Sequence, residues 1–246
     1  MAVPVLLLKG FPLLHDLPDH TLAALAGEAG DLTFAKRGVV LQKGPPTPSL
    51  CLLAEGRLQA VDFTLDGREV GLYFINPWDY VGELSVLDGG EQPEFIIALT
   101  RSRVITLPRE SVRRAVFATP AAAERMALRL SARLRGLGAQ RTILALTSPI
   151  QKICAQLQLL VVQPAAPPPA AGQSAPGQPT LQVRIANAPT HQEIAIMVNT
   201  SRETVTRVFQ VLQAHGAVQR QGNDLLVSDP QLIEQVARGS RELPKA

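Results

Sequence analysis

The chain has 246 residues, of which 46% are hydrophobic and 18% charged, so it can bury a sizeable core and is not disordered throughout. No apolar run reaches the roughly 18 residues of a membrane span, and the N-terminus lacks the basic start of a secretory leader. The two cysteines and four histidines are scattered without a CxxC pair, which excludes zinc-finger, thioredoxin-like and iron–sulfur sites. We therefore expect a cytoplasmic protein with no metal and no membrane partner.

The net charge of +3 is unevenly distributed. Residues 1–118 hold 11 Lys and Arg against 14 Asp and Glu, residues 119–146 hold five against one, and residues 147–246 hold eight against six. A mildly acidic front followed by a basic rear favours a sensor or enzyme part joined to a part that binds a polyanion. Chance asymmetry stays open as the alternative at this point.

The first part of the chain predicts a helix followed by short strands. Residues 12–29 carry apolar positions at helical spacing between turn residues. From residue 32 to 107, short apolar runs alternate with turn sequences every roughly eight to twelve residues, which is typical of an antiparallel sandwich or barrel. Asp66-Gly67, between VDFTL and REVGLYF, is the strongest hairpin signal.

A long helix is predicted from about Ser111 to Leu146. From Ala123 onward its apolar residues repeat every seven positions, the pattern that a two-stranded coiled coil buries. We therefore expect a homodimer, with a helix packed only on its own domain as the alternative. The residues expected in the dimer interface are Met126, Leu130, Leu134, Leu137 and Leu144.

Beyond the long helix, Pro149 opens a further helix that runs to about Val162. Residues 164–180 are rich in proline, alanine and glycine and carry no charge, which predicts a flexible surface insertion.

Residues 189–213, PTHQEIAIMVNTSRETVTRVFQVLQ, predict a helix-turn-helix. Thr190 and Glu193 have the spacing of a capping box, and Asn199 suits the left-handed position of the turn. Ser201 can cap the second helix. The following AVQRQGNDLLVS predicts two strands around a Gly-Asn turn, which together form a wing.

The helix-turn-helix and its wing resemble the DNA-binding domain of the cyclic-AMP receptor protein/FNR family of bacterial transcription regulators. EGRLQAVDFTLDGREVGLYFINPWDYVGELSVLDGG resembles the family's cyclic-nucleotide-binding β-roll, with Gly82-Glu83-Leu84 at its phosphate-cassette position. The implied fold is α+β. It places a β-roll sensor domain in residues 1–118, a dimerisation helix in 119–147 and a winged helix-turn-helix in 148–246.

The resemblance implies double-stranded DNA as a partner, with RNA polymerase as a second one. Arg202, Glu203 and Arg207 match the family's base-reading residues, which implies a palindrome of half-sites close to TGTGA. Arginine can bond guanine O6 and N7, and glutamate can accept from cytosine N4, so the residue types suit the major groove. The other expected DNA-binding residues are Thr206, Gln192, Ser201 and His191, the last standing where the receptor protein has an arginine.

The family's ligand site is incomplete in this chain. Glu83 matches the ribose carboxylate, but Pro93-Glu94 replace an arginine and a hydroxyl residue, and Leu137 and Gly138 replace the adenine-binding hydroxyl pair. Cyclic AMP is therefore disfavoured, and cyclic di-GMP, to which some relatives respond, is slightly favoured. A roll that binds nothing, or an unrelated metabolite, stays open. The residues expected at the ligand site are Gly82, Glu83, Leu84 and Arg133.

An enzyme is not expected, and no catalytic residue is assigned. No GxSxG, HExxH or Walker sequence occurs, and Glu83 with Glu94 is the nearest approach to a catalytic pair. A cyclic-nucleotide-sensing module without DNA activity is a further alternative, against which Arg202, Glu203 and Arg207 argue.

Overall fold

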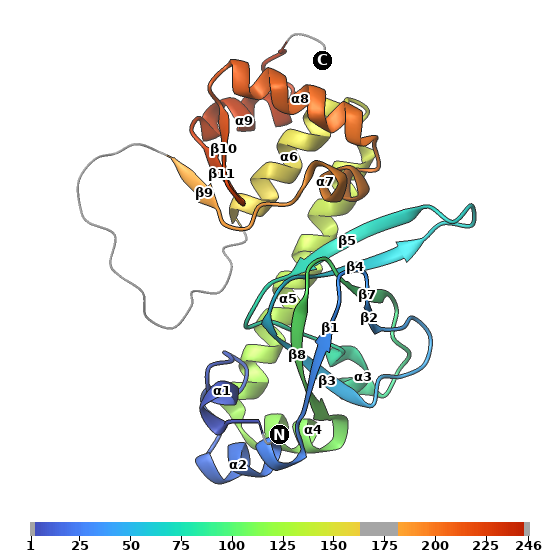
Figure 1. Cartoon of the computed structure of the whole chain (residues 1–246), viewed down its shortest axis with the longest axis vertical. Coiled ribbons are helices and arrows are strands. Elements are labelled where there is room, and N and C mark those ends of the chain that lie inside the picture. The colour runs from blue at the N-terminus through green and yellow to red at the C-terminus, as the bar shows by residue number, and fades with distance from the viewer. Residues whose placement is uncertain (1–2, 163–181, 244–246) are drawn as a thin grey trace, which may run out of the picture. The chain divides into compact units, whose positions relative to one another are not determined.

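Figure 1 shows the computed structural model, which describes residues 3–162 and 182–243. The chain forms two compact units, each of which is described here by itself. The first comprises the residues up to 63 with 72–134, and the second comprises 64–71 with 135–246. Helices and antiparallel sheets confirm the predicted α+β class. The predicted insertion at 164–180 lies outside the described residues.

The first unit contains two antiparallel sheets, with strand orders β1-β8-β3-β6 and β2-β7-β4-β5. All of these strands except β6 fall on apolar runs of the sequence, and β6 is missed because two residues show no alternation. This arrangement confirms the predicted β-roll. The strands are β1 Gly30–Phe34, β2 Val39–Leu41, β3 Ser49–Glu55, β4 Leu58–Phe63, β5 Glu69–Ile75, β6 Tyr80–Val81, β7 Phe95–Ala98 and β8 Ser102–Pro108.

The turn between β4 and β5 lies at the predicted Asp66-Gly67. The Thr64 N–H donates to the Arg68 carbonyl at 2.9 Å, and the Gly67 N–H donates to the Thr64 carbonyl at 2.8 Å. Gly67 has a φ of 78°, which glycine adopts because it has no Cβ to clash. The hairpin prediction is confirmed.

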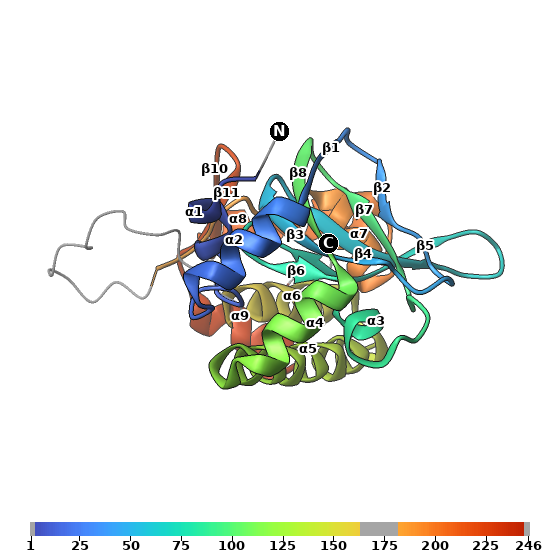
Figure 2. The same ribbon diagram turned by 90° about the horizontal axis from the view of Figure 1, so that it is seen from below.

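The helices of this unit differ in part from the prediction for residues 12–29. The chain turns through residues 11–17, and α2 begins only at Asp19, because Pro18 holds an extended conformation with ψ of 144°. Both α2 and α4 contact β8, and they lie close together in Figure 2. The helices are α1 Val5–Lys9, α2 Asp19–Glu28, α3 Glu83–Asp88 and α4 Arg109–Ala118.

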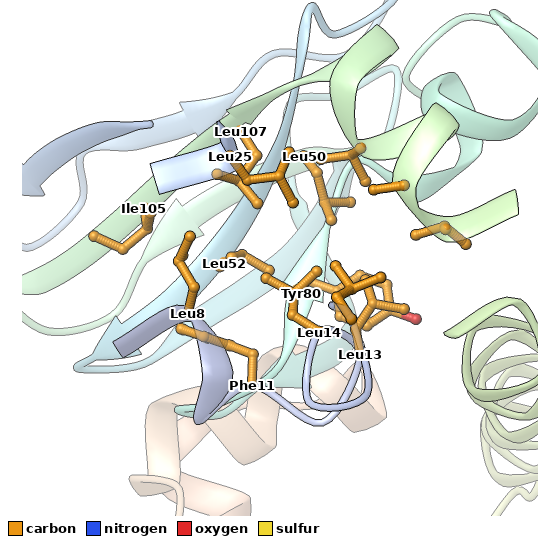
Figure 3. Close-up of a cluster of buried hydrophobic side chains, with 14 of the residues drawn as sticks. Leu8, Phe11, Leu13, Leu14, Leu25, Leu50, Leu52, Tyr80, Ile105 and Leu107 are labelled. Carbon is orange, nitrogen blue, oxygen red and sulfur yellow. The ribbon is translucent and has the colours of Figure 1, made fainter. Parts of the chain in front are cut away.

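Strands β3 and β8 bury side chains on both of their faces. Leu50 and Leu52 of β3 join Ile105 of β8 in a core with residues from α1 and α2, part of which Figure 3 shows. Cys51 and Leu53 point the other way, because side chains alternate along a strand, and join a second core inside the roll. The two strands therefore separate the helical layer from the interior of the roll.

Both cysteines are free and buried. Burial disfavours the charged thiolate and raises the pKa of Cys51 and of Cys154 to about 12.

The long helix α5 spans Pro120–Ala145. It is separate from α4, because Thr119 leaves the helical conformation with φ of −121° and Pro120 starts the next helix. The helical stretch predicted from about Ser111 to Leu146 is therefore confirmed and is divided at Thr119. Helix α6, Pro149–Val162, begins and ends as predicted. The domain boundaries at 118/119 and 147/148 stay predictions.

The second unit packs α6 against α7 and α9, and carries a three-stranded sheet in the order β10-β11-β9. None of the helices in the described ranges combines the length and apolar character that crossing a membrane requires. The remaining elements are β9 Val183–Ile185, α7 His191–Val198, α8 Arg202–Ala214, β10 Val218–Gln221, β11 Asp224–Val227 and α9 Pro230–Ala237.

Helix α1 offers a matched pair of leucines that tests the core of the first unit. Leu8 is 0% exposed and lies in the core with Leu50 and Leu52, whereas Leu6 is 81% exposed. Leu8→Ala should lower the free energy of unfolding of this unit by about 2–5 kcal/mol, because it leaves a cavity. Leu6→Ala should change it by less than about 0.5 kcal/mol. Urea denaturation followed by circular dichroism measures both, and equal effects would contradict the assigned core.

Candidate functional site

The first helix of the helix-turn-helix begins at the predicted capping box. The Glu193 N–H donates to Thr190 Oγ1 at 3.3 Å, and the Thr190 N–H donates to Glu193 Oε2 at 2.9 Å. Asn199 ends the helix with φ of 50° and ψ of 63°, the left-handed conformation predicted for the turn. Gln140 of α5 donates to the Met197 carbonyl at 2.6 Å and so ties the end of α7 to α5.

Helix α8 is capped by Ser201, whose hydroxyl accepts from the Thr204 N–H at 3.1 Å. Val205, Val208 and Leu212 are buried, as predicted for its inner face. Phe209 is buried with them, although the sequence analysis does not single it out. Phe209 directly follows Val208 in the sequence, so the apolar face of α8 is wider than a single row of side chains.

The outer face of α8 exposes Arg202, Glu203 and Arg207. The pKa of Glu203 lies below its ordinary value, because its own backbone N–H and the Ser201 hydroxyl stabilise the carboxylate. Glu203 is therefore ionised at neutral pH and can only accept hydrogen bonds. Two arginines and one carboxylate on a single exposed helix face are the groups that read base edges in a major groove.

The other expected DNA-binding residues differ in exposure and in the hydrogen bonds that their side chains make. Gln192 is exposed, whereas the Ser201 hydroxyl is occupied by its cap. His191 and Thr206 bond each other, with 3.0 Å between His191 Nδ1 and Thr206 Oγ1. The His191 ring also lies against Phe209, with 4.6 Å between ring centroids. These two side chains join α7 to α8.

The wing is formed by β10 and β11, with the turn at the predicted Gly222-Asn223. It has a third strand, β9, and a contact with the helix-turn-helix that the sequence analysis does not include. The Arg220 guanidinium of β10 donates to the carbonyls of Ala188 and Pro189 at 3.0 Å each. The wing is thereby attached to the start of α7. No local pattern marks Arg220, because its partners lie about thirty residues earlier.

Three of the residues expected at the ligand site, Gly82, Glu83 and Leu84, lie at the start of α3. Gly82 has a φ of 88°, and a Cβ there would lie 3.0 Å from the Ser49 carbonyl oxygen and from Thr47 Cγ2, so the position requires glycine. The Glu83 side chain is 1% exposed, while Leu84 remains exposed. The turn therefore places the Glu83 carboxylate inside the roll.

Arg133 of α5 forms an ion pair with Glu83, and its Nη2 donates to the Tyr80 carbonyl at 3.3 Å. The guanidinium lies over the ring of Tyr73, 4.3 Å from its centroid. The structure thus brings together Glu83 and Arg133, which are fifty residues apart. Among the described residues, Arg133 Nε and the Tyr80 hydroxyl are buried without a hydrogen-bond partner.

Glu94 belongs to the same cluster, because the Tyr73 hydroxyl donates to its carboxylate. Burial raises the pKa of Glu94 above its ordinary value, although Tyr73 and Arg133 act in the opposite direction. Burial and the two carboxylates likewise raise the pKa of Tyr73. Glu83 and Glu94 therefore share one arginine, and the inward side of β5 supplies Tyr73, which the sequence analysis does not single out.

The predicted dimer residues differ in exposure along α5. Met126 is buried in the core of the first unit, and Leu130 packs against that core. Leu144 is half-buried, whereas Leu134 and Leu137 are exposed, Leu134 at 72%. Met126 therefore packs within its own chain. The exposed part of the predicted seam consists of Leu134 and Leu137.

Two known domain families match the two parts of the chain. Residues 31–118 match the cyclic nucleotide-binding domain, and residues 151–236 match the Crp-like helix-turn-helix domain. The chain belongs to the cyclic-AMP receptor protein/FNR family. It is therefore a DNA-binding transcription regulator with a cyclic nucleotide-binding domain.

Members of this family are similar over most of the chain. The "Cyclic AMP receptor protein" of Thermus thermophilus is 28% identical over 94% of this chain and 99% of its own length. A "CRP-like cAMP-activated global transcriptional regulator" of Mycobacterium tuberculosis is 26% identical, over 88% and 92%. The structure of FixK2 from Bradyrhizobium japonicum has a TM-score of 0.68 at 16% identity, over 84% and 96%, and shares the fold.

A second solved structure is described as that of the c-di-GMP responsive global regulator CLP of Xanthomonas campestris. It has a TM-score of 0.59 at 21% identity, and covers 85% of this chain and 99% of that one. At this identity the similarity establishes the fold.

The buried carboxylate of Glu94, which departs from the family pattern, predicts a specific pH dependence. Because folding raises its pKa, the folded state holds the proton more tightly than the unfolded state. The protein therefore loses stability as pH rises from 4.5, the ordinary pKa of a glutamate, through the pKa of Glu94 in the folded state. Glu94→Gln removes this titration, so the stability of wild type relative to Glu94→Gln should fall between pH 4.5 and pH 7.

Urea denaturation at both pH values measures this difference. Glu91→Gln, a change at an exposed carboxylate of the same loop, is the matched control. A difference between wild type and Glu94→Gln that stays constant with pH would show that Glu94 titrates normally.

Proposed function

We propose that this regulator acts as a homodimer that reads a palindrome of TGTGA-like half-sites and is controlled by a nucleotide second messenger at the β-roll. The observation that carries the DNA part is the exposed set of Arg202, Glu203 and Arg207 at the N-terminal half of α8. Two such helices, about 34 Å apart in a dimer, match one turn of DNA. A signal at the roll would favour the dimer state with that spacing.

Cyclic di-GMP is the ligand that we favour over cyclic AMP. A cyclic phosphate that faced this cluster would meet two carboxylates and an arginine that is already paired with Glu83, whereas a guanine base would bring no charge to it. Guanine offers acceptors at O6 and N7 and a donor at N2. Arg133 Nε and the Glu94 carboxylate supply the complementary groups. The description of CLP as c-di-GMP responsive is consistent with this choice.

Two alternatives are kept, and a specific observation favours the first. A ligand-independent regulator of the same fold would need Arg133 to be satisfied within the chain, as its contacts with Glu83 and the Tyr80 carbonyl allow. A cyclic-nucleotide-sensing module without DNA activity would leave α8 without a role. Contact with RNA polymerase is part of the proposal and follows from the family alone.

DNA reading is tested by fluorescence anisotropy on a labelled TGTGA-N6-TCACA duplex, against a random duplex. Arg202→Ala and Arg207→Ala should each weaken specific binding by about 1–3 kcal/mol and relax specificity at one base pair. Arg238→Ala is the matched control, because it removes the same charge from an exposed side chain directly after α9. Equal losses of DNA affinity in all three variants would mean that binding depends on net charge alone. No preference over random DNA would reject the half-site.

The ligand is identified by repeating the titration with cyclic AMP, cyclic GMP and cyclic di-GMP. We expect cyclic di-GMP to change the affinity for the specific duplex, and Arg133→Ala to abolish that response. Arg125→Ala, a change on the same helix at a residue paired with Asp16, is the control. Specific binding that no nucleotide changes would favour the ligand-independent regulator. A response to cyclic AMP alone would overturn the preference.

The dimer is tested at the exposed leucines of α5. Leu134→Glu places a charge in the proposed seam and should weaken self-association by about tenfold or more, equivalent to about 1.4 kcal/mol. Leu128→Glu is the matched control, because Leu128 is also exposed on α5 but points away from the heptad row. Light scattering after size-exclusion chromatography measures both. Equal dissociation by the two variants would contradict the seam.

A further inference from the structure

His191 stands where the resemblance to the family implies an arginine, and its side chain makes contacts within the DNA-binding unit itself. Its ring is half-buried between α7 and α8, against Phe209 and in hydrogen-bond contact with Thr206. The Thr206 hydroxyl donates to the Arg202 carbonyl at 3.0 Å. A chain of two hydrogen bonds therefore runs from the first residue of α7 to the first residue of α8.

The direction of these bonds fixes the tautomer of His191. A hydroxyl has one hydrogen, and Thr206 uses it on the Arg202 carbonyl. Thr206 Oγ1 must then accept from His191, so Nδ1 carries the proton of the neutral ring. Nε2 is left as a bare acceptor, which cannot bond to a phosphate. Only the doubly protonated ring offers a second donor.

The charges around the ring keep it neutral in the free protein. Burial, and then Arg220 of β10 and Arg202 of α8, lower the pKa of His191 below its ordinary value. These two arginines are the charged groups that face it. On α7 itself, the Glu193 carboxylate is bonded to the Thr190 N–H. Phosphates of a bound duplex would offset both arginines and stabilise the imidazolium.

We propose that His191 is a positioning residue that holds the recognition helix through Thr206 and Phe209 and takes up a proton when DNA binds. The inference rests on the proposed function, because it requires α7 and α8 to contact DNA phosphates. The complex then holds the ring proton more tightly than the free protein. Affinity for DNA therefore rises as pH falls through the window between the two pKa values, and is flat above that window.

The test measures Kd for the labelled specific duplex between pH 6 and pH 8 at constant ionic strength, with the full chain. Wild type should bind several-fold more tightly at pH 6 than at pH 8, with a slope of at most about tenfold per pH unit. His191→Asn keeps a donor at the place of Nδ1 but does not titrate. It should bind as wild type does at pH 8 and lose the extra dependence on pH. His191→Ala should bind more weakly at every pH.

His215→Asn is the matched control, because His215 is the other histidine of this unit and bonds the Val211 carbonyl at the end of α8. It should keep the slope of wild type. Circular dichroism checks that each variant is folded. A slope in His191→Asn equal to that of wild type would overturn the proton uptake, and full affinity of His191→Ala at pH 8 would overturn the positioning role. Wild type without preference for the specific duplex at any pH would reject the proposed function itself.

Discussion

Strands β3 and β8 form a pair whose alternate side chains belong to two different cores, and the first unit depends on that division. Leu52 faces the helical layer while Leu53 faces the interior of the roll. A register slip of one residue would exchange the two sets, so the pairing is strongly specified. Strand β6 pairs with β3 at Cys51 and Leu52, and the chain then turns at Gly82. The position of Glu83 is therefore a consequence of strand register.

The cluster around Arg133 contains one guanidinium and two buried carboxylates. Glu83 lies where the Gly82 turn places it, and the Glu94 carboxylate accepts from Tyr73, whose ring lies under the Arg133 guanidinium. Breaking a buried ion pair by removing one partner is costly, by about 3–5 kcal/mol, because it leaves an uncompensated charge. The Arg133–Glu83 ion pair therefore fixes this part of α5 to the roll.

Local signals in the sequence were sufficient wherever one or two residues determine a backbone conformation. Thr190 with Glu193, the left-handed Asn199 and the Asp66-Gly67 turn are of this kind, and each occurs where it was predicted. Features that depend on distant partners were not accessible. Strand β9 is short and is defined by its pairing with β11, and the partner of Glu83 lies fifty residues further along the chain. Periodicity also could not show that Met126 packs within its own chain. An apolar row on a helix can pack either on its own domain or on a second copy of the helix.

Burial of Cys51 and Cys154 has a practical consequence for the study of this regulator. With a pKa of about 12, each thiol is ionised at pH 7 to a fraction on the order of 10⁻⁵, and neither is accessible to reagents. The native cysteines would therefore contribute little signal in thiol-specific labelling. A single cysteine introduced on an exposed residue would carry a spin label or fluorophore without removing either native thiol. Such a label on α8 would report directly on the proposed dimer, because the distance between two labels can be measured only if two copies associate.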